Sequence, residues 1–177
     1  EIHSGDWSSD VCSSDLWDYE LGPADREGQS FKARRIANGG SPLDGEYWIP
    51  LLGRHQLENA AAAVAALDLL RRRGLHIPVQ AVHHGLREVW WPGRMEILSQ
   101  DPLVVVDCAH NPYSARTLRA ALEEWFPDRG WVMVFGASAD KDIAGMLETL
   151  VPISDYTLVT RADHPRATAP IELADVV

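Results

Sequence analysis

The chain has 177 residues, of which 46% are hydrophobic and 24% are charged, a composition typical of globular proteins. It excludes a disordered tail, a collagen and a small disulfide scaffold. The net charge of −10 argues against a broad nucleic-acid-binding surface, because phosphate neutralisation needs clustered cations. The two cysteines, Cys12 and Cys108, favour a reducing compartment, and no run of 18 apolar residues predicts a membrane span.

Residues 1–16 differ in composition from the rest of the chain. They contain five serines and four acidic residues but no Lys or Arg, so they fit neither a signal peptide nor a strand. The string SGDWSSDVCSSDL is similar to translated sequencing-adapter DNA, and we interpret residues 1–16 as non-native. Residues 171–177 are typical of a helix start, and we expect the chain to be an internal fragment of a longer protein.

The next part of the chain predicts two strands followed by two helices. Strands are expected over residues 31–36 and 47–52, because turn-forming residues 38–42 separate these two apolar runs. Apolar residues at helical spacing, among them Val64 and Leu70, predict a helix over residues 57–73 that ends in three arginines. A second helix is expected over residues 79–89.

The sequence Trp90-Trp91-Pro92-Gly93 interrupts this periodicity and predicts a domain boundary. Beyond it the chain repeats a strand–loop–helix unit, with strands expected over residues 95–98, 103–106, 131–135 and 156–160. The runs 103–106 and 131–135 are too apolar to alternate, which predicts strands covered on both faces. Strands alternating with helices predict parallel pairing in an open, doubly wound α/β sheet.

Three polar loops follow the carboxyl ends of these strands, where open parallel sheets bind their ligands. They span residues 107–111, 138–142 and 161–166. Asp107 ends an apolar strand and needs a polar partner, which favours a functional role. His110 could serve the site or could cap or pack locally. Asn111 and Asp142 are typical helix caps.

Two further polar residues precede this sheet. Asn59 lies near a helix N-terminus, where backbone N–H groups favour an anion or a polar ligand edge, or it completes the helix cap. Arg94 follows the Pro-Gly boundary, where a planar guanidinium suits phosphate recognition, although a surface ion pair is the alternative. The sequence has no G-x-x-x-x-G-K-[ST] phosphate loop, and the spacing of its histidines predicts no metal site.

Five separated motifs together match one family. They are LLGRHQLENAAAAVAAL, WPGRMEIL, VVVDCAHNP, FGASADKD and HPR, in that order. Over about residues 17–171 the chain resembles the second half of folylpolyglutamate synthase/dihydrofolate synthase, of the Mur ligase superfamily. The muramyl ligases usually read H-N-x-x-N where this chain reads HQLEN. Cys108 stands where the folate enzymes commonly have glycine.

The resemblance implies a fold and a set of site residues. It implies a Rossmann-like C-terminal ligase domain over residues 92–177, with an open and mostly parallel sheet, preceded at residues 17–91 by the end of an ATPase domain. By resemblance, Asn59 would contact the adenine side of ATP, and Arg94 its phosphates or ribose. Asp107 would contact the ribose or the arginine that orients the ribose. His110 would face the γ-phosphate and the incoming glutamate, and Lys141 would help to hold the transition state or the amino acid.

The implied activity is ATP- and Mg²⁺-dependent addition of L-glutamate to folate or dihydropteroate through an acyl phosphate. The enzyme is expected to be a cytoplasmic monomer with no nucleic-acid or membrane partner. Because the family's phosphate loop and most of its metal ligands lie in its N-terminal half, we expect this chain alone to be inactive. Two alternatives remain open, a non-catalytic nucleotide-binding module and a muramyl amino-acid ligase.

Overall fold

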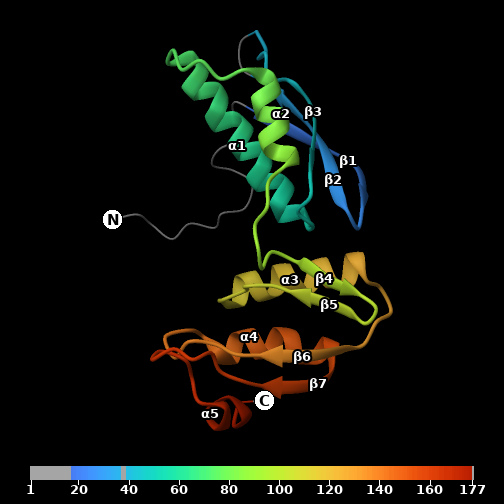
Figure 1. Cartoon of the computed structure of the whole chain (residues 1–177), viewed down its shortest axis with the longest axis vertical. Coiled ribbons are helices and arrows are strands. Elements are labelled where there is room, and N and C mark those ends of the chain that lie inside the picture. Colours follow the sequence, from blue (N-terminus) through green and yellow to red (C-terminus); the bar gives the residue numbers. More distant parts are fainter. Residues whose placement is uncertain (1–16, 37–38, 177) are drawn as a thin grey trace. The chain divides into compact units, whose positions relative to one another are not determined.

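The computed structural model describes residues 17–36 and 39–176 and divides the chain into two compact units, Glu1–Glu96 and Ile97–Val177 (Figure 1). Residues 1–16, which we interpret as non-native, lie outside the described residues, as does Asn38 of the predicted turn. In the described part of the chain, no helix is both long enough and apolar enough to cross a membrane.

The first unit contains a three-stranded antiparallel sheet and two helices. Its elements are β1 (Trp17–Asp25), β2 (Gly28–Arg35), β3 (Gly45–Ile49), α1 (Arg54–Arg72) and α2 (Val79–Arg87), with strand order β1-β2-β3. The two predicted strands and both helices are confirmed. Strand β1 was not predicted, because Trp17 is its one buried residue. The register of β1 against β2 shifts between Leu21 and Ala24, where the strand contains Pro23, as expected of a residue that cannot donate a ladder hydrogen bond.

Helix α1 packs its apolar face against this sheet. Leu57 and Val64 of the helix are buried in one cluster with Phe31, Tyr47 and Ile49 of the strands. Such a continuous cluster supplies most of the stability that holds a helix on a sheet.

The last turns of α1 bury a charged residue. Leu70, part of the helical spacing that predicted this helix, is 39% exposed, whereas Asp68 is buried. The Ser41 hydroxyl donates to Asp68 Oδ1 at 2.6 Å, and Arg72 Nε donates to Asp68 Oδ2 at 2.8 Å. Because these bonds satisfy the carboxylate, the charge of Asp68 can be buried between the helix and the loop before β3.

The second unit repeats strand, loop and helix as the sequence predicts. The elements from the boundary onward are β4 (Glu96–Gln100), β5 (Leu103–Val106), α3 (Pro112–Trp125), β6 (Trp131–Phe135), α4 (Ile143–Leu150), the 3-10 turn η1 (Val151–Ile153), β7 (Ser154–Val159) and α5 (Pro170–Ala174). Leu147 and Met146 of α4 pack with Phe135, Ala115 and Leu173 in one buried cluster. The chain is therefore a mixed α/β protein.

The strands of this unit do not join into the single open sheet that the sequence predicted. Among the described residues β5 pairs with β4, and β6 pairs in parallel with β7. The parallel pairing of β6 and β7 across α4 is the expected crossover. The expected continuation of that sheet from β6 to β5 is not formed: β4 and β5 make one two-stranded sheet, and β6 and β7 make another.

The strands are also covered on one face only. Val132 and Val134 of β6 are 61% and 66% exposed, while Phe135 is buried. Tyr156 and Leu158 of β7 are exposed as well. Helices α3 and α4 lie along the same face of these strands (Figure 1). The prediction of strands covered on both faces is therefore wrong for the described chain, since no described helix covers the second face.

Candidate functional site

Hydrogen bonds join the loops that follow β6 and β7. The Thr160 N–H donates to the Phe135 carbonyl at 2.8 Å, which extends the strand pairing into these loops. Farther along, the Ala139 N–H donates to the Arg166 carbonyl and the Thr168 N–H to the Ala137 carbonyl, both at 2.9 Å. These bonds hold two of the three predicted site loops side by side at the carboxyl end of the parallel pair.

A close helix approach brings the third loop to the same end of the unit. A Cβ atom at Gly145 of α4 would lie 2.7 Å from Cγ of Pro112, the first residue of α3. Only glycine leaves enough room for this approach. The N-termini of α3 and α4 therefore lie together, and the loop that enters α3 lies beside the loop that enters α4.

Asp107 and His110 occupy a tight turn after β5. The half-buried Asp107 accepts the Ala109 N–H at its Oδ1 atom at 2.7 Å, a local bond that fixes the turn. The exposed His110 ring lies with Nδ1 3.2 Å from the Cys108 carbonyl. When Nδ1 carries the hydrogen, it donates to this carbonyl and leaves Nε2 as an acceptor that faces solvent.

Ser114 holds the backbone of this turn and was not predicted as a site residue. Its hydroxyl oxygen accepts the His110 N–H at 2.9 Å and the Asn111 N–H at 3.1 Å. Asn111 Oδ1 accepts the Ser114 N–H at 2.8 Å, which completes a capping box and confirms Asn111 as a helix cap. The hydroxyl three residues after the cap, in Asn-Pro-Tyr-Ser, was the sequence signal for this role.

Lys141 lies in the neighbouring loop as half of an ion pair. Its Nζ atom is 3.0 Å from Asp140 Oδ2, and both side chains are substantially exposed. The hydrogen bond from Lys141 lowers the pKa of the Asp140 carboxyl below its ordinary value of 3.8. Asp140 is therefore charged at neutral pH and restrains Lys141, while Asp142 caps α4 by accepting the Gly145 N–H, as predicted.

Asn59 belongs to the first unit, in the second turn of α1. The helix begins after Gly53, and no side chain caps it, so the alternative in which Asn59 completes the cap is wrong. Asn59 is exposed, and its amide nitrogen donates to Gln56 Oε1 at 3.3 Å. Gln56 is buried, and its Nε2 atom lies 3.0 Å from Nε2 of His55. Asn59 is therefore an exposed side chain that is anchored to Gln56 through its amide nitrogen.

Arg94 also belongs to the first unit and is half-buried. Its Nη1 atom makes a weak 3.3 Å bond to the Gly93 carbonyl, and within the described residues it forms no ion pair. The chain here turns sharply, since both Gly93 and the buried Met95 have positive φ, at 70° and 46°. The surface ion pair considered for Arg94 is therefore not formed, and most of its guanidinium donors are available to an anion.

A divalent cation such as Mg²⁺ needs several oxygen ligands. The described residues contain no group of three or more His, Cys, Asp or Glu side chains that could hold a metal ion. Since Mg²⁺ is usually held by one or two carboxylates together with water and phosphate oxygens, the described residues provide no complete protein cage for it.

Comparison with known proteins identifies the family. Residues 93–177 match the family described as Mur ligase, glutamate ligase domain. The dihydrofolate synthase/folylpolyglutamate synthase of Mycobacterium tuberculosis is 35% identical over 144 residues, which cover 76% of this chain and 30% of that protein. The chain thus spans about a third or less of the length of the curated relatives that it matches.

Solved structures agree with this assignment. Escherichia coli FolC in complex with DHPP and ADP is 30% identical, has a TM-score of 0.67, and is matched over 91% of this chain and 35% of its own. A bifunctional folylpolyglutamate synthase/dihydrofolate synthase with Mn, AMPPNP and L-glutamate bound is 27% identical with a TM-score of 0.62, over 90% of this chain and 35% of its own. The chain belongs to the folylpolyglutamate synthase/dihydrofolate synthase family of Mur ligases.

Proposed function

We propose that this chain is part of an ATP-dependent ligase that joins L-glutamate to a folate or dihydropteroate carboxylate. The observation that carries the proposal is the gathering of three polar loops at the carboxyl ends of β5, β6 and β7, within a domain of the glutamate ligase family. Relatives crystallised with ADP, with DHPP and with L-glutamate support the same substrate classes for this protein.

The proposed reaction has two steps. In the first, the acceptor carboxylate attacks the γ-phosphorus of ATP and forms an acyl phosphate. The bond between the γ-phosphorus and the oxygen that bridges it to the β-phosphate breaks, and ADP is released. In the second, the neutral amine of glutamate attacks the acyl carbon, its proton passes to a base, and inorganic phosphate leaves with the electrons of the C–O bond. Both steps depend mainly on alignment and charge stabilisation.

His110 is suited to the second step. Its backbone is fixed by Ser114, and its Nδ1 atom lies against the Cys108 carbonyl. A neutral imidazole held in this way presents Nε2 to solvent, where it can accept a hydrogen bond or a proton from the glutamate ammonium group. We therefore assign His110 to the glutamate amine and the adjacent phosphate.

Lys141 and Arg94 are suited to the phosphate groups. Lys141 is exposed enough to leave Asp140 for an acyl phosphate, since the ion pair lies in solvent and is weak. Arg94 offers guanidinium donors that no carboxylate occupies among the described residues. We propose that Asn59 contacts the adenine side of ATP. We propose that Asp107 contacts the ribose, or an arginine that orients the ribose. Both side chains are anchored by hydrogen bonds within their own segments.

Mg²⁺ would stabilise the charge that develops on the transferred phosphoryl group. The described residues do not provide the complete ligand set for it, so we assign no step of the reaction to the metal in this chain. We further propose that residues 17–91 end an ATPase domain, that residues 92–177 begin the ligase domain, and that the whole protein is a cytoplasmic monomer.

The test compares this chain with the protein encoded by its intact gene. Glutamate-dependent phosphate release is measured with dihydropteroate, a reduced folate or a UDP-linked peptide as the acceptor. We expect the intact protein to use dihydropteroate or folate and residues 17–177 alone to be inactive. His110→Ala and Lys141→Ala in the intact protein should each lower kcat by about 10²-fold or more, whereas His76→Ala, at an exposed site in the first unit, should not.

Other outcomes would reject the proposal. Turnover with the UDP-linked peptide would identify a muramyl amino-acid ligase. Nucleotide binding by the intact protein without phosphate release would identify a non-catalytic module. Phosphate release by residues 17–177 alone would contradict the expectation that turnover needs the phosphate loop and metal ligands of the family's N-terminal half.

A further inference from the structure

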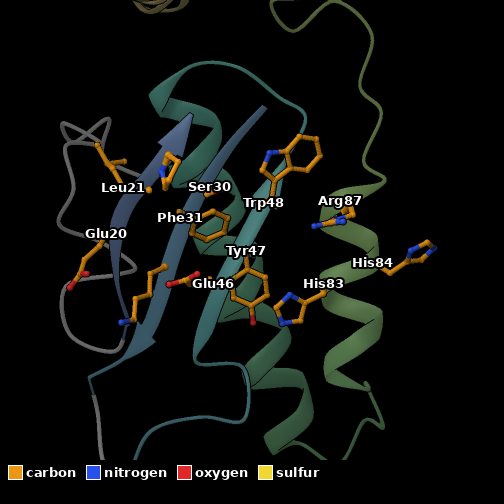
Figure 2. Close-up of a pocket in the computed structure, with 13 residues that line it drawn as sticks. Glu20, Leu21, Ser30, Phe31, Glu46, Tyr47, Trp48, His83, His84 and Arg87 are labelled. Carbon is orange, nitrogen blue, oxygen red and sulfur yellow. The ribbon is translucent and has the colours of Figure 1, made fainter. Parts of the chain in front are cut away.

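The first unit contains a cavity that the proposed ligase function does not use. It has a volume of about 680 Å³ and is bounded by β1, β2, β3 and α2 (Figure 2). Pockets that hold small molecules usually have volumes of about 300 to 1,000 Å³. The cavity is therefore large enough for a ligand of several tens of atoms, and its charged residues indicate what that ligand carries.

Arg87 forms a cationic wall on the helix side of the cavity. Its guanidinium carbon lies 5.9 Å from the centre of the Trp48 ring, a cation–π arrangement. The Trp48 ring in turn packs against Gly28, where a side chain would have no room. Among the described residues Arg87 has no hydrogen-bond acceptor and no carboxylate partner. A planar set of donors is thus held in place by the tryptophan and is available to a carboxylate.

A row of charged residues crosses the sheet along the cavity, from β1 to β3. Glu20 of β1 faces Lys32 of β2, and Lys32 faces Glu46 of β3, as direct cross-strand neighbours. No N···O distance of 4.0 Å or less joins these three side chains. The row has two carboxylates for one ammonium group, so its net charge is −1, and it favours a bound cation.

Arg87 and Glu20 lie on opposite sides of the cavity. Figure 2 shows Arg87 on the α2 side and Glu20 on the β1 side. Arg87 stacks on Trp48 of β3, and since neighbouring strands are about 4.8 Å apart, β1 lies about 10 Å from β3 across the sheet. A ligand that reaches both Arg87 and Glu20 must therefore separate its charges by more than a single amino acid allows. Two or three extended residues span about 7 to 10 Å.

We propose that this cavity binds a short zwitterionic peptide of two or three residues. Its C-terminal carboxylate accepts hydrogen bonds from Arg87, and its N-terminal ammonium group donates to Glu20. This inference does not depend on the ligase function, because every residue in it belongs to the first unit and none is assigned to the reaction.

The test uses the tripeptide Ala-Leu-Ala in three forms: free, N-acetylated and C-amidated. Binding to the 177-residue chain is measured by isothermal titration calorimetry, and circular dichroism verifies that each variant is folded. We expect the free peptide to bind, and each blocked form to bind about tenfold more weakly, because one charge-assisted hydrogen bond is lost.

Variants then assign each end of the peptide to its residue. Arg87→Gln should weaken binding of the free peptide about tenfold but leave binding of the C-amidated peptide unchanged. Glu20→Gln should weaken binding of the free peptide about tenfold but leave binding of the N-acetylated peptide unchanged. The control variants Arg73→Gln and Glu148→Gln, at exposed sites outside the cavity, should bind like the unmodified chain.

The proposal fails if the free peptide does not bind, or if the blocked and free peptides bind equally. It also fails if Arg87→Gln weakens binding of the C-amidated and free peptides by the same factor. In that last case Arg87 would shape the cavity without contacting a carboxylate.

Discussion

Replacing Asp68 by alanine should destabilise the first unit more than any surface charge change. The Asp68 side chain is only 2% exposed and binds Ser41 Oγ and Arg72 Nε. Arg35 Nε lies 3.7 Å from the same carboxylate, and the Arg35 side chain is only 13% exposed. Its Nη1 atom is buried without a hydrogen-bond partner in the described structure. Removing the carboxylate therefore leaves the Arg35 charge buried without its counter-ion.

The magnitude follows from the exposure of each partner. Breaking a buried ion pair from one side costs about 3 to 5 kcal/mol, because the remaining charge stays desolvated. Arg72 is 42% exposed and regains water when the pair is lost, so it adds little. We therefore expect Asp68→Ala to cost about 3 kcal/mol, near the low end of this range. Arg72→Ala should cost about 1 kcal/mol, since Arg35 still neutralises the buried carboxylate.

Native-state hydrogen exchange of α1 measures this change within the unit concerned. Mass spectrometry of peptides from residues 54–72 gives the free energy of opening for each variant. Asp18→Ala is the matched control, because its pair with Arg34 is 3.6 Å long and both side chains are more than half exposed. The control should cost less than about 1 kcal/mol. If Asp68→Ala costs no more than Asp18→Ala, the buried pair does not hold α1, and the reasoning is wrong.

Two further changes test individual contacts. Burial, supported by the charge of Asp44, raises the pKa of Tyr47 from 10.0 to about 12, so the protonated form stabilises the fold. This stability is complete below pH 10 and is lost as the pH rises towards 12. Tyr47→Phe should remove that loss in urea titrations at pH 8 and pH 11.5, at a cost of about 1 kcal/mol at pH 8 for the lost hydrogen bond. Gly145→Ala should lower thermal stability although alanine favours helices by about 1 kcal/mol, because its Cβ would collide with the Pro112 ring at an overpacking cost of about 1 to 3 kcal/mol. An unchanged or higher Tm for this variant would show that the two helices can move apart at little cost.

The sequence predicted the elements well where the signal was local. The helix α3 begins at Pro112 as expected, because Asn111 caps it, and the apolar run of β6 has the predicted bounds. Helical spacing and caps depend on residues within one or two turns of each other. Strand β1 gave no such signal, because its pairing with β2 uses backbone groups and buries little of its own side-chain surface.

Pairing between strands was less predictable because it depends on distant partners. The alternation of strands and helices correctly predicted that β6 and β7 pair in parallel. It did not indicate that β5 would pair with β4, from which two residues separate it, or that β5 and β6 would not pair. Since a hairpin closes a much shorter loop than a crossover, the local partner has the smaller entropic cost. An apolar run alone cannot distinguish these two pairings.

The candidate site shows the same division between local and distant information. The positions of Asp107, His110 and Lys141 after successive strands were readable from the sequence, because each loop directly follows its own strand. What gathers the loops was not readable: a bond from the Ala139 N–H to the Arg166 carbonyl, and the approach of Pro112 to Gly145. Both contacts use backbone atoms or the absence of a side chain, so residue type gives little sign of them. Substitutions at Gly145 should therefore disturb His110 and Lys141 although glycine itself carries no functional group.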